Sequence, residues 1–289
     1  MNRAANRRAI LVYLLVTWTF SSLFYFLIIR SAGTNAASGA YISGLMWCPA
    51  IGALLTCKYL GRPVAGLGWQ WGETRYQVLS YLIPLGYSAV VYSIIWLTGI
   101  AALNPKQTAD AFSRYFGLGP LSREAGIGLY FLVVATTGVI QNCATTLGEE
   151  IGWRGFLVPE LAKRYSFTVT AILSGVIWAL WHMPIIIFGG FNVGTGWYGV
   201  VVVSVNMILL CFVLAWLRLK SGSLWTAVIL HASSNHFIQQ FFDPMTEYTG
   251  RTKYILGEFG IGFTLVVAAL AVYFWMRRAE AVQASAAVL

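Results

Sequence analysis

The chain has 289 residues, of which 58% are hydrophobic and only 10% are charged, and its mean hydropathy is +0.70. Soluble domains carry about 25% charged residues, so the composition excludes an ordinary soluble protein and indicates a polytopic membrane protein. The net charge of +9 does not indicate a nucleic-acid partner. The basic residues lie between apolar runs, where they are better explained as charge on cytoplasmic loops.

Eight apolar segments are each long enough to cross a bilayer, which takes about 20 helical residues. Helix is the only state expected for them, because lipid cannot satisfy exposed backbone groups. The first is too long for a signal peptide and is expected to be retained. The seventh is the weakest, because His231, Asn235 and His236 interrupt it. The segments are Ile10–Ile29, Tyr41–Leu60, Val78–Leu103, Ile127–Leu147, Val169–Phe188, Tyr198–Leu217, Leu224–Phe242 and Tyr254–Met276.

The distribution of basic residues predicts the orientation of these spans. With a cytoplasmic N-terminus, the inner loops and the chain ends hold thirteen of the nineteen basic residues, and the outer loops hold six. This excess on the inside favours eight spans with both termini in the cytoplasm. We therefore expect an all-α membrane bundle that forms one domain over residues 1–289, with its principal motifs within residues 126–242.

The first motif is a charged stretch that follows more than twenty uncharged residues, Gly126 to Gly148. Charge in lipid is expensive, so it is retained for a reason. Glu150 and Arg154 are four residues apart and can pair on one helix face. Glu149 points about 100° away from Glu150, which leaves it available as a general base. A purely structural ion pair explains the same pattern about as well.

Two further polar places lie inside later apolar runs. His231 and Asn235 are again four residues apart, and both can donate hydrogen bonds in one direction, which suits a developing oxyanion. His182 stands alone between Trp178 and Pro184, where it could equally be a hydrogen-bond partner between helices. Spacing alone supports acid–base chemistry or metal binding and does not separate a hydrolase from a proton-coupled transporter.

Taken in order, Glu149-Glu150-x-x-x-Arg154, Trp178-x-x-x-His182 and His231-x-x-x-Asn235 resemble the CPBP family of intramembrane proteases. This family is related to the CAAX prenyl endopeptidase Rce1 and to bacteriocin-processing and immunity proteins. The chain departs from the family pattern at Trp178, where phenylalanine is common.

The resemblance implies a role for each motif residue. Glu149 would activate water with help from His182, while His231 and Asn235 would form the oxyanion hole. Glu150 and Arg154 would orient the first glutamate or the substrate. A metal-free reaction is favoured, although Glu149, His182 and His231 could instead bind zinc with a water in the fourth position.

The resemblance also implies the protein's partners and location. The substrate would be a membrane-attached peptide or protein, and the chain would lie in the lipid bilayer of a bacterial plasma membrane. A non-proteolytic membrane scaffold or immunity factor of the same family is an alternative. A proton-coupled transporter is less favoured, because the sequence has no repeat and no matched pair of broken helices.

The predicted spans place the three motifs at three different depths. A shared site therefore requires the fourth helix to continue from about Gly126 to Pro159, and the fifth to begin nearer Ile172. If the site is shared, the Glu149 carboxylate and the His182 imidazole should lie within about one water of each other.

Overall fold

The computed structural model describes residues 3–31, 38–119 and 121–288, and this part of the chain is built from helices. A single isolated bridge between Leu103 and Thr246 is the only β-type pairing within it. The predicted all-α class is therefore confirmed. The α-helices are α1 (Arg3–Arg30), α2 (Ser38–Tyr59), α3 (Thr74–Leu97), α4 (Pro105–Phe116), α5 (Arg123–Val133), α6 (Val139–Glu150), α7 (Val158–Ala162), α8 (Phe167–Phe188), α9 (Gly196–Ser221), α10 (Trp225–Phe237), α11 (Ile261–Met276) and α12 (Arg278–Val288).

Short 3-10 and π-helical turns join or extend these helices. Three are π-helical, η2 (Val134–Gly138), η3 (Ile151–Leu157) and η4 (Ile238–Phe242), and two are 3-10 turns, η1 (Val64–Leu67) and η5 (Thr252–Tyr254). Single π-helical turns inside α-helices are frequent at functional sites. Here η3 begins directly after the second glutamate of the charged stretch.

Six helices among the described residues are long and apolar enough to cross a membrane, or seven if the bent pair α11–α12 is one span. The chain is therefore a multi-pass integral membrane protein. The predicted seventh span is helical from Trp225 to Phe242 as α10 and η4, but it does not pass the same test. The predicted eighth span is shorter than expected, because its helix begins at Ile261.

The fourth span is one continuous helix of 40 residues, Arg123–Ala162, made of α5, η2, α6, η3 and α7. This confirms that it runs on past Pro159. Such a helix is about 60 Å long, roughly twice the hydrocarbon thickness. The expected start of the fifth helix near Ile172 is wrong. It begins at Phe167, because the Ser166 hydroxyl caps it by accepting a hydrogen bond from the Val169 amide at 3.4 Å.

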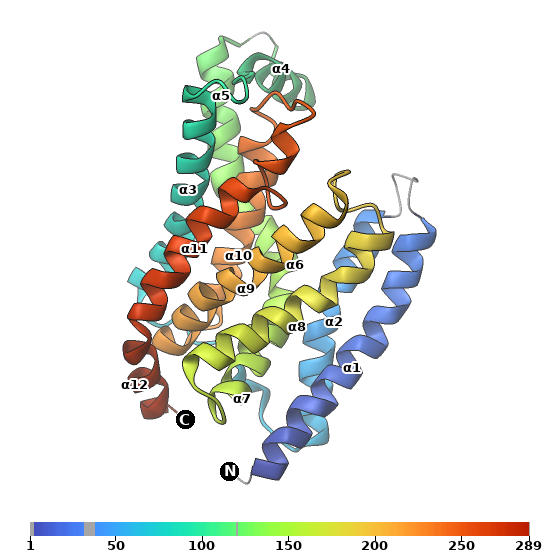
Figure 1. Cartoon of the computed structure of the whole chain (residues 1–289), viewed down its shortest axis with the longest axis vertical. Helices are drawn as coiled ribbons and strands as arrows, with labels where there is room; N and C mark the ends of the chain where they lie inside the picture. Colours follow the sequence, from blue (N-terminus) through green and yellow to red (C-terminus); the bar gives the residue numbers. More distant parts are fainter. Residues whose placement is uncertain (1–2, 32–37, 120, 289) are drawn as a thin grey trace.

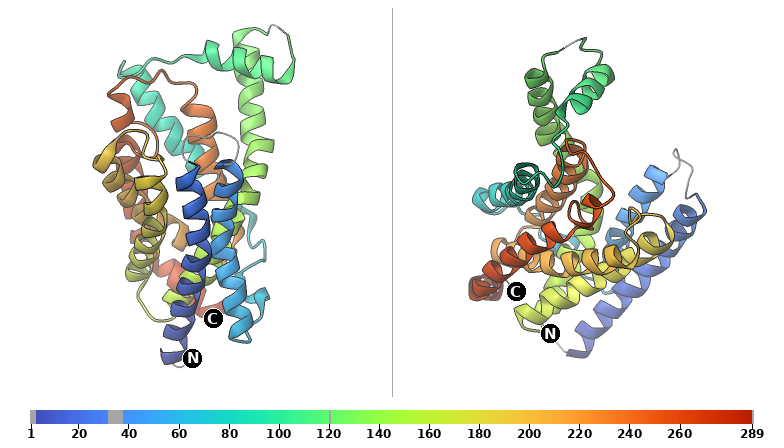
Figure 2. Two further views of the ribbon diagram at one scale, coloured as in Figure 1. Left: turned by 90° about the vertical axis from the view of Figure 1, so that its right-hand side faces the viewer. Right: turned by 45° about the horizontal axis from the view of Figure 1, so that its top comes forward.

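The helices surround α6 in the middle of the molecule (Figure 1). The α1–α2 pair lies along one side, next to α8, while α3, α10 and α11 form the other side. The short helix α4 and the far end of α5 stand away from the main bundle in both views of Figure 2. Both chain ends lie at the opposite end of the molecule. Which of these ends faces the cytoplasm stays a prediction.

Two glycines let the charged stretch approach α2 closely. A Cβ on Gly148 would lie 2.7 Å from the Met46 carbonyl oxygen, and one on Gly152 would lie 2.4 Å from the Pro49 Cβ. These glycines are four residues apart and share a helix face, the spacing that permits close helix contact in membranes. With that face pressed against α2, the neighbouring glutamates turn toward the interior of the bundle.

Candidate active site

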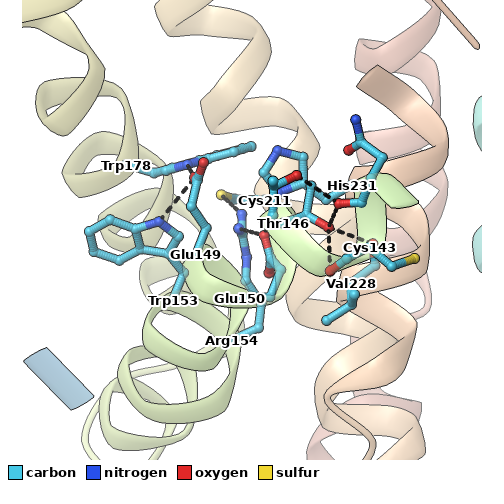
Figure 3. A network of polar contacts seen from close by, with 12 residues as sticks. Cys143, Thr146, Glu149, Glu150, Trp153, Arg154, Trp178, Cys211, Val228 and His231 are labelled. Atoms are coloured by element: carbon cyan, nitrogen blue, oxygen red, sulfur yellow. Dashed lines mark hydrogen bonds and ion pairs between the residues drawn. The ribbon is translucent and has the colours of Figure 1, made fainter. Parts of the chain in front are cut away.

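The two adjacent glutamates have different environments, although both are almost completely buried. Glu150 Oε1 accepts hydrogen bonds from Arg154 Nη1 at 2.7 Å and from His231 Nδ1 at 2.8 Å. The ion pair expected from the four-residue spacing is therefore present, and the His231 contact joins the end of α6 to α10 (Figure 3). Because the carboxylate accepts, His231 Nδ1 carries a proton, which leaves Nε2 for another partner.

Glu149 is held by indoles and has no salt bridge among the described residues. Its Oε2 accepts hydrogen bonds from Trp178 Nε1 at 2.8 Å and Trp153 Nε1 at 3.4 Å. Figure 3 shows Glu149 pointing toward these two indoles, while Glu150 points toward Arg154 and His231. No donor from the described part of the chain contacts Oε1 of Glu149. One carboxylate oxygen is thus fixed and the other is left for chemistry.

Trp178 is the residue at which the three motifs meet. Its indole donates to Glu149, its carbonyl oxygen lies 3.0 Å from His182 Nδ1, and its ring lies 5.3 Å from that of His231. The Arg154 guanidinium also stacks over its ring at 4.4 Å. Side chains from α6, α8 and α10 therefore converge around one indole, as the shared-site hypothesis requires.

His182 and Asn235 are less tightly held than the glutamates. His182 is partly buried, and because a carbonyl only accepts, its Nδ1 donates to Trp178 and its Nε2 stays available. No hydrogen bond connects Glu149 directly to His182 in the described part of the chain. Asn235 is partly buried one turn after His231, and across the described ranges its side-chain amide makes no hydrogen bond. Their predicted roles stay predictions.

The proposed zinc ligands are not gathered into a metal site. Within the described residues, no group of three His, Cys, Asp or Glu side chains is placed to hold a metal ion. The Nδ1 atoms of His231 and His182 are directed at Glu150 and at the Trp178 carbonyl, and one oxygen of Glu149 is directed at two indoles. These contacts leave both Nε2 atoms and Glu149 Oε1 without a partner among the described residues, and metal-ligating histidines also direct their other ring nitrogen at a carboxylate or carbonyl.

Three of the contacts that build the site are not among the sequence predictions. The indoles of Trp153 and Trp178 both donate hydrogen bonds to Glu149. Cys211 on α9 accepts a hydrogen bond from Arg154 Nη2 at 3.1 Å. A tryptophan four residues after a buried carboxylate, as Trp153 is after Glu149, is a signal that could have been recognised.

Comparison with known proteins points to the same family that the motifs resemble. Residues 127–237 match the family model of type II CAAX prenyl endopeptidase Rce1-like proteins. The CAAX prenyl protease 2 of Methanococcus maripaludis is 33% identical over 132 residues, which are 43% of this chain and 45% of that relative. The match therefore spans less than half of the relative's length.

The fold and the site together define a polytopic membrane protein with a buried two-glutamate centre. Over residues 127–237 the chain is similar to the Rce1-like family of CAAX prenyl endopeptidases, in agreement with the resemblance carried by its motifs.

Proposed function

We propose that this protein is an intramembrane endopeptidase of the CPBP type that hydrolyses peptide bonds of membrane-attached peptides or proteins. The proposal rests on the different hydrogen-bond partners of the two glutamates. Glu150 accepts hydrogen bonds from both Arg154 and His231. Glu149, in contrast, is buried, is oriented by two indoles and has one oxygen that no donor among the described residues contacts. That is the arrangement that a general base needs.

In the proposed reaction, Glu149 Oε1 takes a proton from a water as the water oxygen attacks the carbonyl carbon of the scissile bond. The new oxyanion is stabilised by donors at His231 Nε2 and the Asn235 amide. Because Nδ1 of His231 already donates to Glu150, Nε2 can donate only when the imidazole is doubly protonated. The negative charge of Glu150 favours that form.

The intermediate then collapses and the carbon–nitrogen bond breaks. The proton held by Glu149 passes to the departing amine, directly or through His182. Glu150 and Arg154 act as positioning residues, because they fix His231 and contact Trp178 instead of reaching the substrate. No step requires a bound metal.

The substrate and the location follow from the membrane setting. The site lies among helices that cross the bilayer, so a peptide attached to the membrane reaches it most readily. We place the protein in a bacterial plasma membrane, in keeping with its resemblance to bacterial family members. The relative described above is named CAAX prenyl protease 2, so the peptide library should include prenylated CAAX peptides.

The decisive experiment measures cleavage of a membrane-peptide library by purified protein and by its Glu149→Gln variant. Glutamine keeps the size of the side chain and an oxygen acceptor but cannot serve as the base, so we expect a loss of roughly 10²–10⁴-fold in kcat. Glu124→Gln is the matched control, because Glu124 is exposed at the start of α5.

Three outcomes would redirect the proposal. Equal activity of the two glutamine variants would contradict a catalytic Glu149. If the natural protein cleaves no peptide and Glu149→Gln leaves the cellular phenotype unchanged, the scaffold or immunity-factor alternative is favoured. Proton flux in proteoliposomes that depends on Glu149 would favour a transporter. The same assay with chelator tests the zinc alternative, and we expect activity to persist.

A further inference from the structure

A cavity lies at the end of the molecule that holds both chain termini. Its volume is about 480 Å³. It lies between the loop that follows α2, the η3–α7 segment and the last turn of α9, and Glu149, His182 and His231 are not among its lining residues. It is therefore separate from the candidate active site.

The lining of this cavity carries an excess of positive charge. Arg62, Lys163 and Arg218 are its cationic residues, and Glu160 is its only carboxylate. Glu160 Oε1 pairs with Arg62 Nη1 at 3.0 Å and with Lys163 Nζ at 2.6 Å, so one carboxylate is shared by two cations. Three positive charges and one negative charge leave a net formal charge of plus two around the cavity.

Arg218 is the least compensated of these cations. It is only 7% exposed, and it donates to the carbonyl oxygens of Arg154 at 2.9 Å, Gly222 at 2.7 Å and Leu67 at 3.4 Å. Three bonds use part of the five N–H groups of a guanidinium, and neutral carbonyls do not cancel its charge. Buried charges are normally paired, and in the described ranges no carboxylate pairs with Arg218.

The loop around Arg218 is shaped to bring backbone against the guanidinium. Gly68 has a φ of +90°, and a Cβ there would lie 2.5 Å from Arg218 Nη2. Gly222 has a φ of +71° at the end of α9 and supplies one of the three carbonyls. Side chains other than glycine would be strained at both positions. At this end of the cavity, the backbone therefore packs closely around the Arg218 guanidinium.

The cavity also adjoins residues that are typical of the membrane–water interface. Trp69 and Trp71 follow Gly68 in the same loop, and tryptophans are enriched at the membrane–water interface. Basic pockets between membrane helices at this level bind anionic headgroups. We propose that this cavity binds a phosphate group, the chemistry that a phospholipid headgroup shares with free phosphate, with Lys163, Arg62 and Arg218 as its cations.

The pocket adjoins the helix that carries the candidate catalytic residues. Arg218 Nε donates to the backbone carbonyl of Arg154, and Gly155 and Phe156 of η3 also line the cavity. A bound anion would hold Arg218 in place and so stabilise η3. The proposal stands on the cavity alone and does not depend on the proposed peptidase activity.

The test measures thermal unfolding of the full chain in neutral detergent, with dihexanoyl phosphatidylglycerol, dihexanoyl phosphatidylcholine or inorganic phosphate added. At a tenfold excess over its dissociation constant, a bound ligand should raise Tm by roughly 3–6 °C. The key variant is Ala65→Glu, which adds a carboxylate at an exposed lining position and removes no existing contact. Ala65→Gln is its matched control.

Phosphatidylglycerol that stabilises the natural chain and Ala65→Gln, but not Ala65→Glu, would support a headgroup site. The same pattern with inorganic phosphate would support the pocket and identify free phosphate as the ligand. Equal shifts with phosphatidylcholine and phosphatidylglycerol in all three proteins would overturn the proposal, as would no shift in the natural chain or an undiminished shift in Ala65→Glu.

A second pair of variants removes charge in place of adding it. Arg62→Gln with Lys163→Gln should abolish the shift. Lys106→Gln with Arg114→Gln should preserve it, because both exposed cations lie on α4 at the other end of the molecule. Equal shifts in the two double variants would overturn the proposal.

Discussion

At the scale of single residues, two glutamates that are neighbours in sequence receive different partners in space. One hundred degrees of helix rotation directs Glu150 toward Arg154 and His231, and Glu149 toward Trp178 and Trp153. An indole N–H neutralises no charge, so it can orient a carboxylate without competing for it as an arginine would. Trp178 therefore orients the Glu149 carboxylate, which a phenylalanine at this position could not do because it has no hydrogen-bond donor.

Trp178→Phe should lower kcat with little change in KM. Hydrogen bonds to charged groups contribute about 1.5–3 kcal/mol, which corresponds to roughly a 10–100-fold loss if the bond orients the base in the transition state. Trp153→Phe should have a smaller effect, because its contact is longer at 3.4 Å. Trp216→Phe is the control, since that buried indole donates to the Arg277 carbonyl instead. Full kcat in Trp178→Phe would contradict the orienting role.

Glu150→Ala should destabilise the fold as well as reduce activity. The change leaves the buried Arg154 and His231 without their shared carboxylate, and breaking a buried ion pair in this way costs on the order of 3–5 kcal/mol. Thermal unfolding in detergent measures the effect, with the exposed Glu124→Ala as control. Equal unfolding temperatures for Glu150→Ala and Glu124→Ala would show that Glu150 does not stabilise the fold.

At the scale of elements, the position of the site depends on how the charged stretch packs. Gly148 and Gly152 bring α6 and η3 against α2, and the two glutamates between them then face the bundle interior. The π-helical turn η3 places the Arg154 guanidinium against Glu150, Cys211 and Trp178 together. The first two helices lie outside the matched family region, yet they fix the helix that carries both glutamates.

Gly152→Leu should therefore impair both stability and cleavage. Its Cβ would lie 2.6 Å from the Tyr13 hydroxyl and 2.4 Å from the Pro49 Cβ, so α1 and α2 would have to move. Overpacking of this kind costs about 1–3 kcal/mol or more. Gly128→Leu is a matched control, because nothing lies within 4 Å of that position's Cβ. A Gly152→Leu protein as stable as Gly128→Leu would argue against the close contact.

At the scale of the whole molecule, the two chain ends lie together and α4 lies at the far end. Reporter fusions at the N-terminus and the C-terminus should both report the cytoplasm, and a fusion at Gly119 should report the opposite side. This outcome follows from the excess of basic residues near the termini, which sets the orientation of membrane helices. Reporters on opposite sides for the two termini would contradict the orientation.

The sequence by itself determined the class of protein and most helix positions, and it nominated the residues of the candidate site. It could do so because lipid permits only helices and because charge inside apolar runs is retained for a purpose. The continuation of the fourth helix could also be foreseen, since Glu149, His182 and His231 could not otherwise share a site.

Only the tertiary structure decided which partner each glutamate receives. Trp178 and Cys211 are apolar or weakly polar residues in a chain full of such residues, so their approach to the charged stretch has no sequence signature. The basic cavity likewise depends on three segments that lie far apart in sequence. Contacts between distant segments depend on how helices pack, and helix pattern alone does not specify that packing.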